Sequence, residues 1–210
     1  MKMKLLKYWV HVRKILKIRN FFLLWILADI LLLLNFSGCV KYSSANFHKI
    51  LKKGETTKEY KIQTIKPGIH RLQYRFFMND SLLEESGWML PYPVFQFRIS
   101  DVNSDKNPDI LVGVIKTTRF DTVNRKRIFI FQIYDHRIVP LWLGSRVSQP
   151  LVDFNTIIKN DMVFIRTIER ERKHHYLVAE YRWKSFGLEF MKYIKRNVIL
   201  DEANVLLKEQ

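Results

Sequence analysis

The sequence predicts an antiparallel all-β domain that follows a hydrophobic N-terminal segment. Short stretches of alternating apolar and polar residues recur after Val40, and VFQFRI at residues 94–99 is the clearest of them. A period of two is the pattern of a half-buried strand. No segment after Val40 has a persuasive helical period, and Gly, Pro, Asn and Asp separate the alternating stretches. The 210 residues, 48% of them hydrophobic, suffice for one domain with a hydrophobic core.

The N-terminal segment is organised like an export signal. Seven Lys and Arg residues and no acid occupy the first twenty positions, and a mostly apolar run follows at residues 21–36. A basic region, an apolar region and small residues at a boundary are typical of a signal peptide. The motif Ser37-Gly38-Cys39 at that boundary resembles a bacterial lipobox. The resemblance implies that Cys39 becomes the lipidated first residue of the mature protein, although Phe36 departs from the usual Leu, Val or Ile.

An uncleaved signal anchor is the alternative for this segment. As a helix, residues 21–36 span about 24 Å, short of the ~30 Å hydrocarbon core unless the helix continues to Val40. Asp29 is costly in a membrane in either case. Cys39 is the only cysteine, so it forms no internal disulfide. Both alternatives attach the protein to the membrane and place everything after Cys39 outside the cytoplasm, in the cell envelope.

The chain after the leader is still basic. Residues 40–210 hold 29 Lys and Arg against 19 Asp and Glu, a net charge of +10, compared with +16 for the whole chain. An exported basic domain attracts anionic lipid headgroups or polyanionic glycans. Nucleic acid is not an expected partner in that compartment. A lysine-rich solvated surface without a specific partner is the alternative.

Alternation and turn residues divide the chain into a leader at residues 1–39, a tether and a β-domain. Residues 40–58 have no sustained period and suit a tether, so the β-domain is expected at residues 59–210. A hairpin comes first, a long connection at residues 78–93 follows, and two sets of four strands complete the domain. The expected strands are residues 60–65, 70–77, 94–99, 110–115, 127–134, 137–142, 151–154, 162–168, 174–183 and 186–194, with a short helix within 200–210.

An Asp-rich loop joins the first two strands of the first four-strand set. Oxygen-bearing side chains recur there at every second position, namely Asp101, Asn103, Asp105, Asn107 and Asp109. Ca²⁺ prefers six to eight oxygen ligands, and alternating Asp and Asn on a tight loop can converge on one point. In such a site Asn107 would offer its backbone carbonyl. A metal-free polar turn between strands is the alternative.

This loop resembles the Asp-rich loops of FG-GAP (VCBS-type) repeats, the blades of integrin-like β-propellers. Those loops run Asp-x-Asp/Asn-x-Asp-Gly-x-x-Asp. Four residues of this chain match that pattern in place, namely Asp101, Asn103, Asp105 and Asp109. Lys106 stands where the pattern has Gly, and a left-handed backbone there costs on the order of 1 kcal/mol. The resemblance covers about one blade, residues 94–144, and implies calcium between two strands. Two blade-like sets and a hairpin are too few for closure, so an open or partial propeller or a sandwich is expected.

Catalytic motifs are weak. The sequence has no Ser-centred Gly elbow, no phosphate-cradling Gly loop and no Cys/His zinc spacing. His174 and His175 are adjacent, so on a strand they point to opposite faces and cannot share a metal. Glu84 and Glu85 are the one pair considered as glycosidase carboxylates, and neighbours on one loop seldom flank a scissile bond.

These observations predict an exported, lipid-anchored protein of the cell envelope. We expect it to act as a non-catalytic binding or structural module, with Ca²⁺ as its candidate cofactor. Two alternatives stay open. One is an accessory subunit of an envelope complex that presents a basic aromatic surface to a partner protein. The other is a hydrolase acting on envelope glycans, which requires a carboxylate pair in a cleft.

Overall fold

The computed structural model describes residues 46–119, 121–144 and 147–209, so the predicted signal segment and the lipid attachment site at Cys39 lie outside the described residues. The described chain is all-β, as predicted, with antiparallel strands and one C-terminal helix. No helix within these ranges is long and apolar enough to cross a membrane.

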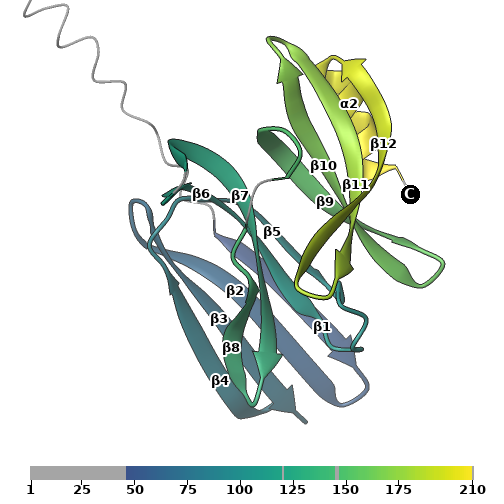
Figure 1. Ribbon diagram of the computed structural model, residues 1–210. Helices are drawn as coiled ribbons and strands as arrows, with labels where there is room; N and C mark the ends of the chain where they lie inside the picture. The colour runs from purple at the N-terminus through teal and green to yellow at the C-terminus, as the bar shows by residue number, and fades with distance from the viewer. Residues whose placement is uncertain (1–45, 120, 145–146, 210) are drawn as a thin grey trace, which may run out of the picture. The chain divides into compact units, whose positions relative to one another are not determined.

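Three meanders of four strands follow one another along the chain (Figure 1). The first meander, β1–β4, forms a sheet of its own. The second, β5–β8, and the third, β9–β12, join into one eight-stranded sheet through a single residue pair, Lys126 with Leu151. The strands are β1 Phe47–Lys53, β2 Thr56–Lys66, β3 Ile69–Met78, β4 Ser81–Leu90, β5 Val94–Ser100, β6 Asp109–Thr118, β7 Asp121–Tyr134, β8 Arg137–Trp142, β9 Leu151–Lys159, β10 Met162–Arg172, β11 His175–Lys184 and β12 Gly187–Val198, and the helix is α2 Leu200–Lys208.

Short turns set the register of these meanders. Three hairpins have two-residue loops with positive φ at both positions, which is the geometry of a type I′ turn: residues 79–80, 135–136 and 160–161. Each loop draws on Asn, Asp or His, residue types that tolerate the left-handed region better than most. The two residues left between the strands expected at 127–134 and 137–142 form one of these turns, at Asp135-His136.

Two segments expected to be irregular are strands instead. Residues 40–58, expected to be a tether, contain β1 and the start of β2, and residues 78–93, expected to be a connection, contain β4. Both β1 and β4 are edge strands with one partner each, so pairing stabilises them although much of their surface stays exposed. The prediction of two four-strand sets and a hairpin is therefore wrong, since there are three sets. Within the described residues neither sheet closes on itself.

Two hydrophobic clusters hold the meanders together, and β6 contributes to both. The first cluster joins β2 and β3 to the second meander, and its fully buried side chains include Tyr60 and Phe131. The second joins the second and third meanders around Leu111 and Phe154. Successive side chains of a strand face opposite sides, so a strand buried on both faces carries a continuous apolar run. The strand predicted at residues 110–115 is thereby confirmed, and it is buried on both faces.

The C-terminal helix α2 lies on one face of the third meander (Figure 1). Buried Arg166 of β10 donates hydrogen bonds to the carbonyls of Leu206 (2.5 Å) and Glu209 (2.6 Å). Its guanidinium also donates to buried Glu180, at 2.7 Å. The last carbonyls of a helix have no partner within the helix, so Arg166 satisfies groups that would otherwise be buried unpaired.

Candidate functional site

The Asp-rich loop lies between β5 and β6, as predicted, and its side chains bind its own backbone. Asp101 accepts the backbone N–H groups of Asp105 at 3.1 Å and Lys106 at 2.8 Å. Asp105 in turn accepts that of Asn107 at 2.7 Å. Lys106, which stands where the FG-GAP pattern has Gly, has φ of +70°, in the left-handed region. These bonds compensate part of the cost of that conformation.

Asp109 is the buried acid of the loop, with 1% of its surface exposed. Burial raises the pKa of its carboxyl to about 7, the N–H groups of Val102 and Asn103 oppose this rise, and the charges of Asp105 and Asp101 add to it. A carboxylate oxygen that accepts a backbone N–H keeps a second lone pair, so the hydrogen bonds from Val102 and Asn103 do not exclude a cation at Asp109. The described residues contain no group of three or more His, Cys, Asp or Glu side chains that could hold a metal. Calcium binding by this loop stays a prediction.

The other candidates from the sequence do not come together. Glu84 binds His136 at 2.6 Å, whereas Glu85 approaches Arg75 at 3.4 Å. The two glutamates occupy consecutive positions of β4 and therefore point to opposite faces. His174 has a positive φ in the turn before β11, and its neighbour is the first residue of that strand.

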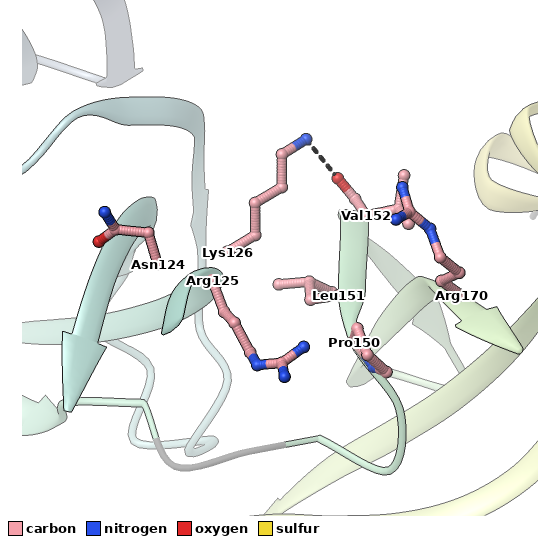
Figure 2. A pocket seen from close by; sticks show the side chains of 7 residues that line it. All are labelled: Asn124, Arg125, Lys126, Pro150, Leu151, Val152 and Arg170. Carbon is pink, nitrogen blue, oxygen red and sulfur yellow. Dashed lines mark hydrogen bonds between the residues drawn. The ribbon is translucent and has the colours of Figure 1, made fainter. Parts of the chain in front are cut away.

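A basic pocket lies where the second meander meets the third (Figure 2). Its volume is about 240 Å³, and it is lined by residues 124–126 of β7, residues 150–152 at the start of β9, and Arg170 of β10. Three lining residues are cations and none is an acid. Pairing between β7 and β9 is limited to one residue pair, so the neighbouring side chains line a hollow instead of continuing the ladder.

Lys126 belongs to the wall of this pocket. Its ammonium donates a hydrogen bond to the Val152 carbonyl at 2.6 Å and lies 4.4 Å from the ring centre of Phe95. Burial lowers the pKa of Lys126, the Asp153 carboxylate opposes that shift, and the positive charge of Arg170 lowers the pKa further. Lys126 and Arg170 thus repel each other across the pocket.

The two arginines of the pocket differ in their counter-ions. Arg125 pairs with Asp121 at 2.9 Å, an acid that it shares with Arg127 at 3.1 Å. Arg170 is exposed, and within the described ranges its guanidinium has no acid and no hydrogen-bond partner. Figure 2 shows Arg125 and Lys126 passing on different sides of Leu151, with Arg170 beyond the first residues of β9. The cations therefore approach the pocket from different directions.

Buried Glu169 holds Ser148 and Gln149 in place, the two residues that precede Pro150 in the wall of the pocket. Its carboxylate accepts hydrogen bonds from the Ser148 hydroxyl at 2.7 Å and the Gln149 N–H at 2.5 Å. The hydroxyls of Thr167 and Tyr181 supply two more, each at 2.7 Å. A buried carboxylate is tolerated only when it is well bonded. The four donors meet that condition and hold this segment beside the pocket.

The sequence did not reveal this pocket. The expected strands left residues 117–126 and 169–173 between them. In the structure residues 117–118 belong to β6, residues 121–126 to β7 and residues 169–172 to β10, so Arg125, Lys126 and Arg170 lie on strands. The run Arg125-Lys126-Arg127 was the available signal, but it gave no indication that Arg170 lies beside it.

Comparison with protein-family models, with characterised proteins and with solved structures gives no match to this chain. The lipobox and FG-GAP resemblances therefore rest on their motifs alone.

Proposed function

We propose that this protein is an exported, membrane-anchored module of the cell envelope that binds a polyanionic glycan and catalyses no reaction on it. The observation that carries the proposal is the basic pocket, in which Arg125, Lys126 and Arg170 surround a cavity of about 240 Å³. Export and anchoring rest on the basic leader, the apolar run and the lipobox-like motif.

The electrostatics of the pocket support an anionic ligand. Burial is the main cause that lowers the pKa of Lys126, and repulsion by the like charge of Arg170 lowers it further. An anion placed between them replaces this repulsion with two attractions, which are stronger near a partly buried site than in open water. Arg170 needs no rearrangement to bind, because it has no partner to leave within the described chain.

Binding of dextran sulfate, with neutral dextran as the ligand control, tests this function. The full chain in mild detergent is titrated at several salt concentrations, together with Arg170→Gln and Arg125→Gln. Arg137→Gln is the matched control, because Arg137 is an exposed arginine of β8 whose ion-pair partner among the described residues is Asp135. We expect each pocket variant to weaken binding about tenfold and the control to leave it unchanged. Equal affinities in all four proteins would refute the proposal.

The calcium prediction has its own test. A ligand that binds only the folded state raises the free energy of unfolding by RT ln(1 + [L]/Kd), about 2.7 kcal/mol at a hundredfold excess over Kd. We expect a calcium-specific stabilisation, absent with magnesium or chelator and lost in Asp101→Ala. If millimolar calcium leaves the wild-type unfolding temperature unchanged, the loop is a polar turn.

The anchor and the blade-like meanders complete the proposal. We expect mass spectrometry of the mature protein to find a lipidated N-terminal Cys39, and Cys39→Ala to abolish lipidation. Three successive four-strand meanders are consistent with an open, propeller-like arrangement. An intact leader in the mature protein would favour the signal anchor instead.

A further inference from the structure

We infer that the β-domain docks on the membrane surface by one of its ends, and that the cations of this end bind the headgroups of anionic phospholipids. The inference rests on the membrane anchor of the proposed function, and it assigns the surface of the domain that faces the bilayer.

The first argument is the place where the chain enters the domain. Asn46 is the first described residue, and its side-chain oxygen accepts the Thr64 N–H at 3.0 Å. Thr64 pairs with His70, whose ring nitrogen Nδ1 donates a hydrogen bond to the Tyr92 carbonyl at 3.0 Å. Lys116 of β6 donates a hydrogen bond to the Tyr92 hydroxyl at 3.1 Å. The chain therefore enters at the end of the first two meanders that carries the β2–β3 turn and the last residues of β6, which we call the entry end.

The second argument is the length of chain between the anchor and this end. Cys39, the predicted lipid attachment site, precedes Asn46 by seven residues. Seven fully extended residues span at most about 25 Å. A signal anchor that continues to Val40 leaves a still shorter connection. In both cases the covalent chain keeps the entry end close to the bilayer.

The third argument is the distribution of charge along the first two meanders. Strand register divides them into the entry end, at residues 46–48, 61–73, 87–96, 113–119 and 121–128, and an opposite end, at residues 49–60, 74–86, 97–112 and 129–142. The entry end holds eight Lys and Arg against one acid, Asp121, a formal net charge of +7. The opposite end holds eight Lys and Arg against nine Asp and Glu, a formal net charge of −1.

The third meander does not change this polarity. Its segments that adjoin the entry end, residues 147–153 and 168–175, add three Lys and Arg and three Asp and Glu, so the net charge stays at +7. The surface potential of anionic lipids attracts Lys and Arg that lie within about one Debye length, ~8 Å at physiological ionic strength. The end that the chain holds near the membrane is thus the end whose charge complements an anionic bilayer.

The fourth argument is the kind of side chain exposed at the entry end. Lys66, Arg71 and Arg119 are exposed cations. Two aliphatic side chains of the same end, Ile65 beside Lys66 and Val123 near the start of β7, are each 54% exposed. At a bilayer surface, apolar groups enter the boundary of the acyl chains while the charged heads of Lys and Arg stay among the headgroups. This mixture therefore suits a lipid surface.

Amine footprinting of the full chain in nanodiscs tests the docking. One set of discs contains phosphatidylcholine alone, and the other contains phosphatidylcholine with phosphatidylglycerol. Mass spectrometry measures the rate of acetylation at Lys66 of the entry end and at Lys53, an exposed lysine of the opposite end that serves as the internal control. We expect phosphatidylglycerol to slow acetylation of Lys66 about fivefold and to leave that of Lys53 unchanged, because bound headgroups cover the Lys66 ammonium and keep it protonated.

Charge-reversal variants establish which cations hold the domain on the bilayer. Arg71→Glu combined with Arg119→Glu should restore most of the Lys66 rate, and Arg71→Gln with Arg119→Gln is a second pair in case the first misfolds. Lys52→Glu combined with Arg137→Glu is the matched control, because both are exposed cations of the opposite end. This control should leave the slowing at Lys66 unchanged.

The outcomes separate this inference from the glycan-binding proposal. Equal slowing at Lys66 and Lys53, or none at either, would refute the docking. If soluble dextran sulfate slows Lys66 in phosphatidylcholine discs whereas phosphatidylglycerol does not, the entry end binds glycan and the lipid assignment is wrong. If Lys66 is slowed as expected while dextran sulfate binding is independent of Arg170, the glycan proposal fails and the docking stands. A chain that does not stay with the discs refutes the anchor and the docking together.

Discussion

Replacing Asp109 with Asn should change how the stability of this protein depends on pH. Burial raises the pKa of the Asp109 carboxyl from 3.8 to about 7. The folded state therefore holds this proton more tightly than the unfolded chain does. Between pH 4 and pH 7 the folded state binds more protons, so the free energy of unfolding falls as the pH rises. Below pH 4 both states are protonated and this contribution is fully present.

The magnitude follows from the size of the shift. Each unit of pKa difference between the folded and unfolded states corresponds to 1.36 kcal/mol. A difference of about three units therefore lowers the free energy of unfolding of the wild type by about 4 kcal/mol between pH 4 and pH 8. Asn has the same shape, does not titrate, and keeps an oxygen that can accept the Val102 N–H at the observed 2.9 Å. From pH 4 to pH 8, the free energy of unfolding of Asp109→Asn should therefore rise by about 4 kcal/mol relative to that of the wild type.

Urea unfolding followed by tryptophan fluorescence, at pH 4 to 8 in the presence of chelator, measures this difference. Asp161→Asn is the matched control, because Asp161 is an exposed acid in the turn between β9 and β10 and is not among the charges that raise the pKa of Asp109. A difference between Asp109→Asn and wild type that stays constant with pH would refute the reasoning from burial. Repeating the series in millimolar calcium adds information, since a bound cation would hold Asp109 ionised and remove the loss of stability in the wild type.

Three other predictions concern the packing and ion pairs. Arg166→Met removes the buried cation that pairs with Glu180 at 2.7 Å and leaves Lys159, at 2.6 Å, as the remaining close cation. The variant should cost about 3 kcal/mol in urea unfolding, and adding Glu180→Leu should recover part of this loss; a double variant as unstable as the single one contradicts this. The hydrogen bond to the Glu84 carboxylate raises the pKa of His136. The stability that this pair contributes is therefore fully present below pH 6.5 and is lost as the pH rises through the raised pKa. An NMR titration that places the pKa of the His136 ring at or below 6.5 would contradict this prediction. Gly113→Ala puts a Cβ 2.7 Å from the Phe95 ring and should cost about 1–3 kcal/mol, and an unchanged unfolding midpoint would show that the ring moves freely.

Local patterns were sufficient for much of the fold. Alternation predicted a half-buried strand at residues 94–99, and residues 110–115 were expected to form the next strand. Both are present, as β5 and β6. These features depend on a few neighbouring residues, because side-chain period and backbone sterics act locally.

The sequence by itself determined the all-β class, most of the strands and the Asp-rich loop. Only the tertiary structure decided that β1 and β4 are strands, because edge strands are stabilised by their partners more than by their own pattern. The basic pocket likewise required the tertiary structure. Arg125 and Lys126 meet Arg170 only because β7 and β9 pair at Lys126 and Leu151 and then separate. Charge can be counted along a chain, but the place where charges converge depends on which strands lie side by side and in what register.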